Sequence, residues 1–149
     1  MTIVRLGAIA LVLGLMVSAA QASWPLVTPE EDRRDDAAPH KPGPADVPGP
    51  PTIEVRRPDL SAPIRNPATI DILFSAGAGR TINMQSFRAT YGWLGIDITR
   101  RLLQHATKTL DSLTAADVDL PGGSHKVTLS IADNAGKRAS RTFTLTVAR

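Results

Sequence analysis

The alternation of apolar and polar residues after Pro51 constrains the fold of this chain more than any other feature. In the two clearest runs, residues 126–131 and 142–147, every second residue is Val, Leu, Ile or Phe. A period of two is typical of a β-strand with one buried face. Runs of the same kind occupy residues 53–56, 70–75 and 87–91. Because turn residues separate these runs, the sequence predicts an all-β chain folded as an antiparallel sandwich of about seven strands.

Two glycine-containing segments are predicted to be turns. Asp133-Asn134-Ala135-Gly136 separates the last two runs and suits a tight hairpin connection. Residues 77–80, Gly-Ala-Gly-Arg, have no Lys-Ser pair after them and no strand-loop-helix setting, as a phosphate loop would require. We therefore interpret residues 77–80 as the point where the chain passes from one sheet to the other.

One segment departs from the alternation and predicts a short helical turn that bridges the two sheets. Leu102, Leu103 and Ala106 follow one another at helical spacing, and Thr99 before them is placed to cap the helix. The apolar residues that follow should return the chain to the core. These residues are Leu110, Leu113, Val118 and Leu120.

The region before Pro51 has a different composition. Eight prolines lie between residues 24 and 51, and proline removes backbone donors, so we predict a disordered, proline-rich linker over residues 23–51. This linker carries six acidic and three basic residues, whereas residues 52–149 carry thirteen basic and eight acidic ones. The remaining length allows a single domain, which we place at residues 52–149.

The first 22 residues have the pattern of a secretory signal peptide. Arg5 is followed by an apolar run to Val17 and then by Ala20-Gln21-Ala22, which predicts cleavage between Ala22 and Ser23. The apolar run is shorter than the roughly 20 residues that span a bilayer, so no stable membrane span is expected after cleavage. We expect an exported protein, either periplasmic or secreted.

The segments near the C-terminus resemble a known family. Residues 119–137, which include Leu-Pro-Gly-Gly and Asp-Asn-Ala-Gly, and residues 141–147 resemble the last two strands of bacterial immunoglobulin-like domains. Residues 95–99 are similar to a mid-domain element of the same family, and His125 stands where a corner tyrosine is often found. The resemblance covers residues 52–149 and implies an immunoglobulin-like β-sandwich of an exported bacterial protein. It implies no particular activity and no cofactor.

Candidate catalytic and metal-binding residues are few. The chain has no cysteine, which excludes disulfides, thiolate metal sites and cysteine nucleophiles. Its three histidines, His40, His105 and His125, are far apart in sequence, and nothing brings two of them together. A catalytic role would require His105 or His125 to meet a carboxylate and a hydroxyl in space. We therefore predict no enzyme activity, no catalytic residue and no cofactor.

Other polar pairs have simpler explanations. Asp117 with Asp119 and Asp133 with Asn134 provide too few oxygens for Ca²⁺, so we interpret them as turn-capping residues and predict no metal site. Ser124-His125 cannot act as a nucleophile and base, because neighbours on a strand point to opposite faces.

Three residues are candidates for ligand contact. Tyr91 continues the inward register of its strand and should lie in the core. Trp93 follows the end of that strand, which leaves two alternatives for it, packing against the domain or stacking on a ligand. We take Trp93, with Arg100 and Arg101 nearby, as the tentative contact set, because an aromatic ring flanked by polar groups suits sugars.

The leading functional hypothesis is an exported, non-enzymatic interaction module. Its partner is unknown, either an envelope or extracellular protein or a polysaccharide, and nucleic acid is not expected for an exported chain. The first alternative is a carbohydrate- or envelope-polymer-binding module that uses Trp93; an exposed ring beside a shallow groove would favour it. The second alternative is an adhesin or assembly subunit that pairs through an uncovered edge strand, either residues 52–57 or the last strand.

Overall fold

The computed structural model describes residues 22–43 and 45–149. The predicted signal peptide lies outside the described residues except for Ala22, which is exposed together with Ser23. In the described part of the chain, neither helix is long and apolar enough to cross a membrane.

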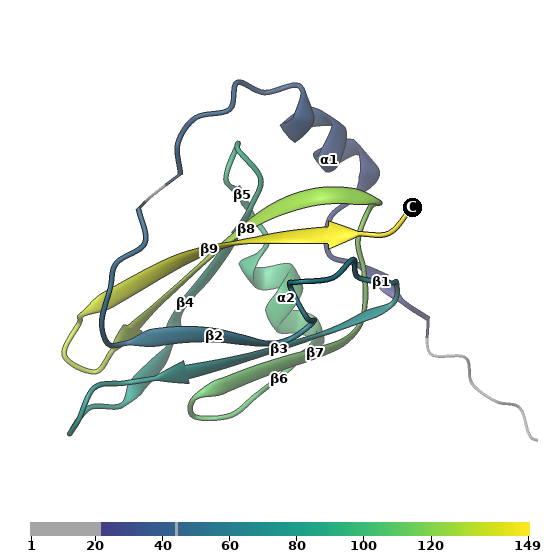
Figure 1. Cartoon of the computed structure of the whole chain (residues 1–149). Helices are drawn as coiled ribbons and strands as arrows, with labels where there is room; N and C mark the ends of the chain where they lie inside the picture. The colour runs from purple at the N-terminus through teal and green to yellow at the C-terminus, as the bar shows by residue number, and fades with distance from the viewer. Residues whose placement is uncertain (1–21, 44) are drawn as a thin grey trace, which may run out of the picture.

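Two β-sheets pack face to face, so the predicted all-β sandwich is confirmed (Figure 1). Sheet A has the order β1-β7-β3-β2, and β6 also pairs with β7. Sheet B has the order β5-β4-β8-β9. All pairs are antiparallel except β1 with β7.

The strands of sheet A are β1 (Trp24–Pro25), β2 (Thr52–Arg57), β3 (Ala68–Ser75), β6 (Ala106–Lys108) and β7 (Ser112–Asp119). Those of sheet B are β4 (Ile82–Tyr91), β5 (Ile96–Asp97), β8 (Gly123–Asp133) and β9 (Arg138–Val147).

The core lies between the sheets and follows the alternation in the sequence. Each of the five predicted runs is part of a strand, and the apolar residues of each run point inward, except that Val55 is only half-buried. Phe74 of sheet A and Phe87 of sheet B meet edge to face, with ring centroids 5.7 Å apart. Tyr91 is buried, as predicted. Hydrophobic burial between two amphipathic sheets is therefore the main source of stability.

Both predicted turns are confirmed. Asp133 Oδ1 accepts hydrogen bonds from the amides of Ala135 and Lys137, each at 2.9 Å, and so closes the hairpin between β8 and β9. Residues 77–80 join β3 of sheet A to β4 of sheet B. Gly79 in that loop has φ +70, a conformation that glycine adopts without steric cost.

The predicted helical turn is α2 (Thr99–His105), and it contacts β4 of sheet B and β6 and β7 of sheet A. The predicted role of Thr99 as its cap is wrong. Thr99 Oγ1 instead accepts from the amide of Ala89 and donates to the Ala89 carbonyl, which fixes α2 to β4. Asp97 Oδ1 accepts the Thr99 amide at 2.8 Å.

The return from α2 to the core is partly as predicted. Leu113, Val118 and Leu120 are buried on or just after β7, but Leu110 is 87% exposed at the turn between β6 and β7. The added strand β6 places Leu110 at the tip of a hairpin, outside the core.

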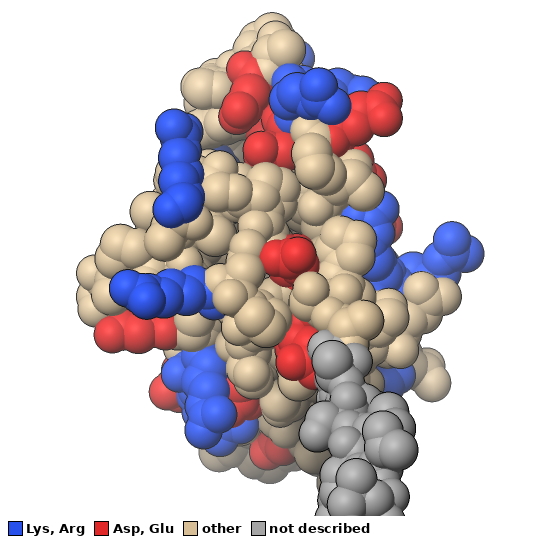
Figure 2. Space-filling view, turned by 90° about the vertical axis from the view of Figure 1, so that its right-hand side faces the viewer, with Lys and Arg blue, Asp and Glu red and all other residues tan. Residues whose placement is uncertain are grey.

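The prediction of disorder throughout residues 23–51 is wrong for the first half of this region. Trp24 and Pro25 form β1, and Pro29–Asp36 form α1 at the top of the molecule, where acidic and basic side chains are interspersed (Figure 2). Leu26 and Val27, only 1% and 2% exposed, belong to the core. The folded unit therefore begins at Trp24.

The helix α1 has strong local reasons to form. Thr28 Oγ1 accepts the Glu31 amide at 3.2 Å, and Glu31 Oε2 accepts the Thr28 amide at 2.9 Å, which is a capping box. Pro29 occupies the first turn, where its missing N–H costs no hydrogen bond. Proline at this position starts a helix.

The described residues between 38 and 51, which we call the strap, contain neither helix nor strand, in accord with their proline content. The strap runs from α1 down beside β9 and leads into β2 (Figure 1). Asp46 Oδ1 accepts the Thr142 amide at 3.0 Å, and the Val47 amide donates to the Ser140 carbonyl at 3.3 Å. The strap therefore covers part of the β9 edge.

We predict that Leu26→Ala lowers the free energy of unfolding by about 2–5 kcal/mol, because it leaves a cavity between the sheets. The control is Val47→Ala on the strap, where Val47 is 47% exposed, and this change should be close to neutral. Urea denaturation measures both variants. Equal stability of Leu26→Ala and the unsubstituted protein would mean that residues 24–27 are not part of the core.

Candidate functional site

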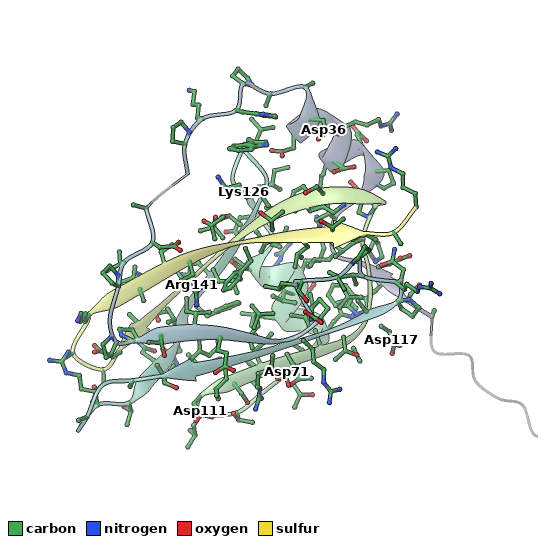
Figure 3. The ribbon with its side chains drawn as sticks, in the orientation of Figure 1. Asp36, Asp71, Asp111, Asp117, Lys126 and Arg141 are labelled. Carbon is green, nitrogen blue, oxygen red and sulfur yellow. The ribbon has the colours of Figure 1, made fainter. Side chains whose placement is uncertain are left out.

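A cleft of about 550 Å³ opens where α1 and the strap face β8, β9 and the loop after β4. Asp36 of α1 and Lys126 of β8 lie at this end of the molecule (Figure 3). The side chains around the cleft are mostly polar, with one large aromatic ring exposed among them. The lining residues are Asp35, Asp36, His40, Tyr91, Trp93, Ser124, His125, Lys126 and Thr144.

Trp93 is the exposed aromatic ring of the cleft. It lies in the loop between β4 and β5 and is 36% exposed. The His40 ring from the strap stacks on it with a centroid separation of 4.4 Å and an interplanar angle of 19°. Lys126 Nζ lies 4.1 Å from the centroid of the Trp93 ring. Trp93 is thus held by a stacking contact and a cation–π contact, while about a third of its surface is open to solvent.

The position of the Trp93 loop depends on Gly92. A Cβ atom at this residue would overlap the Asp35 carboxylate, and the φ angle of +73 is one that other residues rarely adopt. The close approach lets Asp35 Oδ1 accept the Leu94 amide at 2.7 Å, although Asp35 is only 5% exposed. The buried carboxylate of Asp35 therefore fixes the Trp93 loop to α1.

A buried polar network forms one wall of the cleft. The Tyr91 hydroxyl lies 2.5 Å from Asp32 Oδ1 and 2.5 Å from His125 Nδ1. The other ring nitrogen of His125, Nε2, donates to the Pro121 carbonyl at 2.6 Å. For this chain, a catalytic role would require a histidine that meets a carboxylate and a hydroxyl in space. His125 of β8 meets both, in Asp32 of α1 and Tyr91 of β4.

The three side chains of this network are in mutual contact. The Tyr91 hydroxyl has a single hydrogen, which it donates to Asp32 Oδ1. His125 Nδ1 lies beside the same hydroxyl and 3.3 Å from the same carboxylate oxygen.

The network has the character of a structural junction. Burial raises the pKa of Tyr91, and the hydrogen bond to Asp32 raises it further, so the phenol stays protonated. Both nitrogens of His125 already have partners, and His125 is 3% exposed. The three side chains therefore join α1 to both β4 and β8.

Arg101, one of the predicted ligand contacts, is engaged within the chain. Its guanidinium donates to Glu31 Oε2 at 2.8 Å and Oε1 at 2.9 Å, and to the Leu26 carbonyl at 2.6 Å. The bidentate bond to Arg101 lowers the pKa of Glu31 from 4.5 to about 2, and the same bond raises the pKa of Arg101. Arg101 therefore fixes α1 to α2 and is not available in the cleft.

Arg100 lies in a different groove. This groove, of about 420 Å³, lies between β4, β5 and α2 and is lined by Arg88, Asp97, Thr99, Arg100, Leu103 and Gln104. The structure thus brings Trp93 into the cleft and leaves both predicted arginines outside it. The notion of one contact set made of Trp93, Arg100 and Arg101 has no geometric support.

The remaining sequence candidates have structural roles. His105 stacks on Trp24 with a centroid separation of 4.1 Å. Asp117 has φ +56 at an irregularity of β7, a conformation that aspartate tolerates better than most residues. Asp133 closes the hairpin and also accepts from Arg80 at 3.0 Å. Within residues 22–43 and 45–149, no group of three or more His, Asp or Glu is placed to bind a metal ion.

Sequence reasoning missed Asp32 and Asp35 and did not predict the place of His40 in the cleft, because all three lie in the region assigned to a disordered linker. One signal was available for the first two. Thr28 followed three residues later by Glu31, with Pro29 between them, is the pattern of a helix start. No local signal places His40 against Trp93.

Comparison with protein-family models, with curated proteins and with solved structures finds no match to this chain. The geometry of the site is therefore the basis for a functional proposal.

We predict that Tyr91→Phe lowers the free energy of unfolding by about 1–3 kcal/mol, since it leaves Asp32 and His125 without the hydroxyl between them. Asp36→Asn, an exposed change on the same helix, should have little effect. Urea denaturation at neutral pH compares the two variants. If both are as stable as the unsubstituted protein, the network does not hold α1.

A second prediction concerns acid. Because the pKa of Glu31 is lower in the folded protein than its ordinary value, its pairing with Arg101 stabilises the fold above about pH 4.5. This contribution is lost as the pH falls towards about 2. The difference in stability between the unsubstituted protein and Glu31→Gln should therefore shrink over this range. A difference that is constant with pH would contradict the pairing.

Proposed function

We propose that this chain is an exported, non-enzymatic binding module with an immunoglobulin-like fold, which binds carbohydrate at the Trp93 cleft. The observation that carries the proposal is the stacking of the flat His40 ring on a partly exposed Trp93. One face of the Trp93 ring accommodates a second flat ring at stacking distance, and in this structure that ring is His40. A sugar ring that displaced His40 would find the same surface.

The strand order supports the immunoglobulin-like part of the proposal. Sheet A carries β2, β3, β7 and β6 in that order, and sheet B carries β5, β4, β8 and β9. Labelled A to G along the chain from β2, with β5 as C′, these sheets read A-B-E-D and C′-C-F-G. This is the order of immunoglobulin-type sandwiches. The short extra elements β1, α1 and α2 add to that frame without changing it.

The polar lining supports carbohydrate as the ligand class. Ser124, Thr144, Lys126 and Asp36 line the same cleft as the Trp93 ring and contribute two hydroxyls, an ammonium and a carboxylate. Sugars present apolar ring faces with hydroxyls around the rim, so an aromatic face beside hydrogen-bonding groups is complementary to them. The dimensions of the cleft suit a few sugar units at most, since its volume is about 550 Å³.

The polar network supports a role without catalysis. Tyr91 and His125 border the cleft, but their hydrogen-bonding groups are taken up by one another, by Asp32 and by Pro121. A general base needs a free lone pair directed at the substrate. Binding of a ligand does not require such a free lone pair, so the network is compatible with a binding site.

The sheet edges give less support to an adhesin or assembly subunit. The strap bonds to Ser140 and Thr142 of β9, and Ile64 bonds to Thr146 and Ala148 at the end of that strand. On β2, the Ile53 carbonyl accepts from Arg141, which lies between β9 and β2 (Figure 3). An added strand would have to displace these contacts.

We predict that Trp93→Ala weakens binding to a soluble polysaccharide about tenfold, because stacking on an aromatic ring contributes on the order of 1 kcal/mol or more. The probes are hydroxyethyl cellulose, dextran and methyl-esterified polygalacturonate, each measured by affinity electrophoresis. Leu94→Ala, a neighbouring change at a residue that is 49% exposed, is the matched control and should bind normally. Binding of Trp93→Ala at full strength, or of no probe by the unsubstituted protein, would contradict the proposal.

A further inference from the structure

The outer face of sheet B is unusual in composition. The residues that point outward are 86, 88 and 90 on β4, the even-numbered residues 124–130 on β8 and the even-numbered residues 138–146 on β9. Every one of these twelve residues is Ser, Thr, Lys or Arg. We call this surface the hydroxyl face. On these three strands the outward positions hold no acidic or apolar residue. The neighbouring strand β5 contributes one acid, Asp97, which pairs with Thr90 and lines the same groove as Arg88.

The cations of the hydroxyl face have no acidic partner among the described residues. Arg88, Lys126 and Arg138 form no ion pair there. Arg88 Nη1 donates to the Phe87 carbonyl at 2.7 Å, and Arg138 Nη1 donates to Ser130 Oγ at 3.2 Å. Their guanidinium groups are thus held near the sheet by neutral acceptors, and their positive charge is not compensated by a contact.

Sheet A offers a direct comparison. There Arg56 bonds to Asp71 at 2.9 Å, and Asp71 also accepts from Thr114 at 3.2 Å. One cation of that sheet is therefore matched by an acid on a neighbouring strand. The three cations of the hydroxyl face form no such ion pair, and their positive charge favours an anionic ligand.

The hydroxyl face is continuous with both grooves described above. Lys126 borders the Trp93 cleft, and Arg88 borders the groove that also contains Arg100. Lys126 and Ser130 are four residues apart on β8, which corresponds to about 13 Å along the strand, and Arg88 pairs with Ser130 across it. A chain that begins at Trp93 can therefore reach Arg88 and Arg138 without leaving the sheet.

The chain itself places one carboxylate against this face. Asp46 of the strap accepts the amide of Thr142, an outward residue of β9. The strap is otherwise balanced in charge, because Asp46 is its one acid and Lys41 its one base, and the other five acids of residues 23–51 lie in α1. The strap thus places a single carboxylate of an extended segment at the border of the hydroxyl face.

We propose that the hydroxyl face binds an acidic polysaccharide, whose chain extends from the Trp93 cleft towards Arg88 and Arg138. This inference rests on the proposed function for the cleft and names its ligand class. Carboxylates of the polymer would bond to the guanidinium groups, and its hydroxyls would bond to the serine and threonine side chains. A polymer that carries both groups along its length is complementary to the whole face.

The test compares two polymers with one backbone, polygalacturonate and its methyl ester, which differ in charge. The purified protein should bind polygalacturonate more tightly, and added salt should reduce the difference. The double variant Arg88→Gln/Arg138→Gln should lose about tenfold in affinity for polygalacturonate and little for the ester. The control is Arg57→Gln/Arg65→Gln, which removes two exposed charges outside the hydroxyl face and should bind normally.

The outcomes separate the two proposals. Equal binding of both polymers, or equal losses in the two double variants, would overturn the acidic-polysaccharide proposal while carbohydrate binding at Trp93 could still stand. If Trp93→Ala binds polygalacturonate normally but Arg88→Gln/Arg138→Gln does not, the proposal that Trp93 contacts the polymer is wrong and the proposal for the hydroxyl face stands. Binding of single-stranded DNA or of anionic lipid vesicles as tightly as polygalacturonate would overturn the assignment to a polysaccharide, since the face would then respond to charge alone.

Discussion

Leu26 and Val27 are apolar residues at the end of a polar, proline-rich region, and their burial determines much of the rest of the structure. Leu26 lies among Ile70, Leu102 and Leu129, which come from sheet A, α2 and sheet B. Removing a leucine side chain from water contributes about 1.5–3 kcal/mol, which is enough to fix a short segment against the core. With these two residues buried, Thr28 caps α1, which lies across the end of the sandwich beside β4 and β8.

The polar contacts of α1 then determine how it lies. Arg101 donates to both Glu31 and the Leu26 carbonyl. Asp35 accepts the Leu94 amide of the Trp93 loop, and Asp32 accepts the Tyr91 hydroxyl. Partly exposed ion pairs add little to stability, and buried polar groups are unfavourable unless each has a partner. No buried side-chain nitrogen or oxygen among the described residues lacks one. These contacts therefore provide specificity, and they build the cleft in which Trp93 is exposed.

The sequence predicts the sandwich well and the site poorly, for reasons that can be traced to particular residues. Strands such as 126–131 and 142–147 are encoded locally, because a period of two and a turn at 133–136 are visible in a short window. The prediction of disorder is wrong for the first half of the linker because proline can also start a helix, and Pro29 stands at a helix start with Thr28 and Glu31 around it. The contacts of Trp93 with His40 and Lys126 join residues more than thirty positions apart, and only the folded chain brings them together.

The central claim is that residues 24–36 belong to the folded domain and build one wall of the cleft, and amide hydrogen exchange tests it most directly. The Leu26 amide donates to the Asp119 carbonyl at 3.0 Å, and the Leu94 amide donates to Asp35 at 2.7 Å. Both amides should exchange far more slowly than those of the exposed strap and nearly as slowly as amides within β7. Exchange of Leu26 and Leu94 at the rate of an unstructured peptide, with β7 protected, would contradict the account.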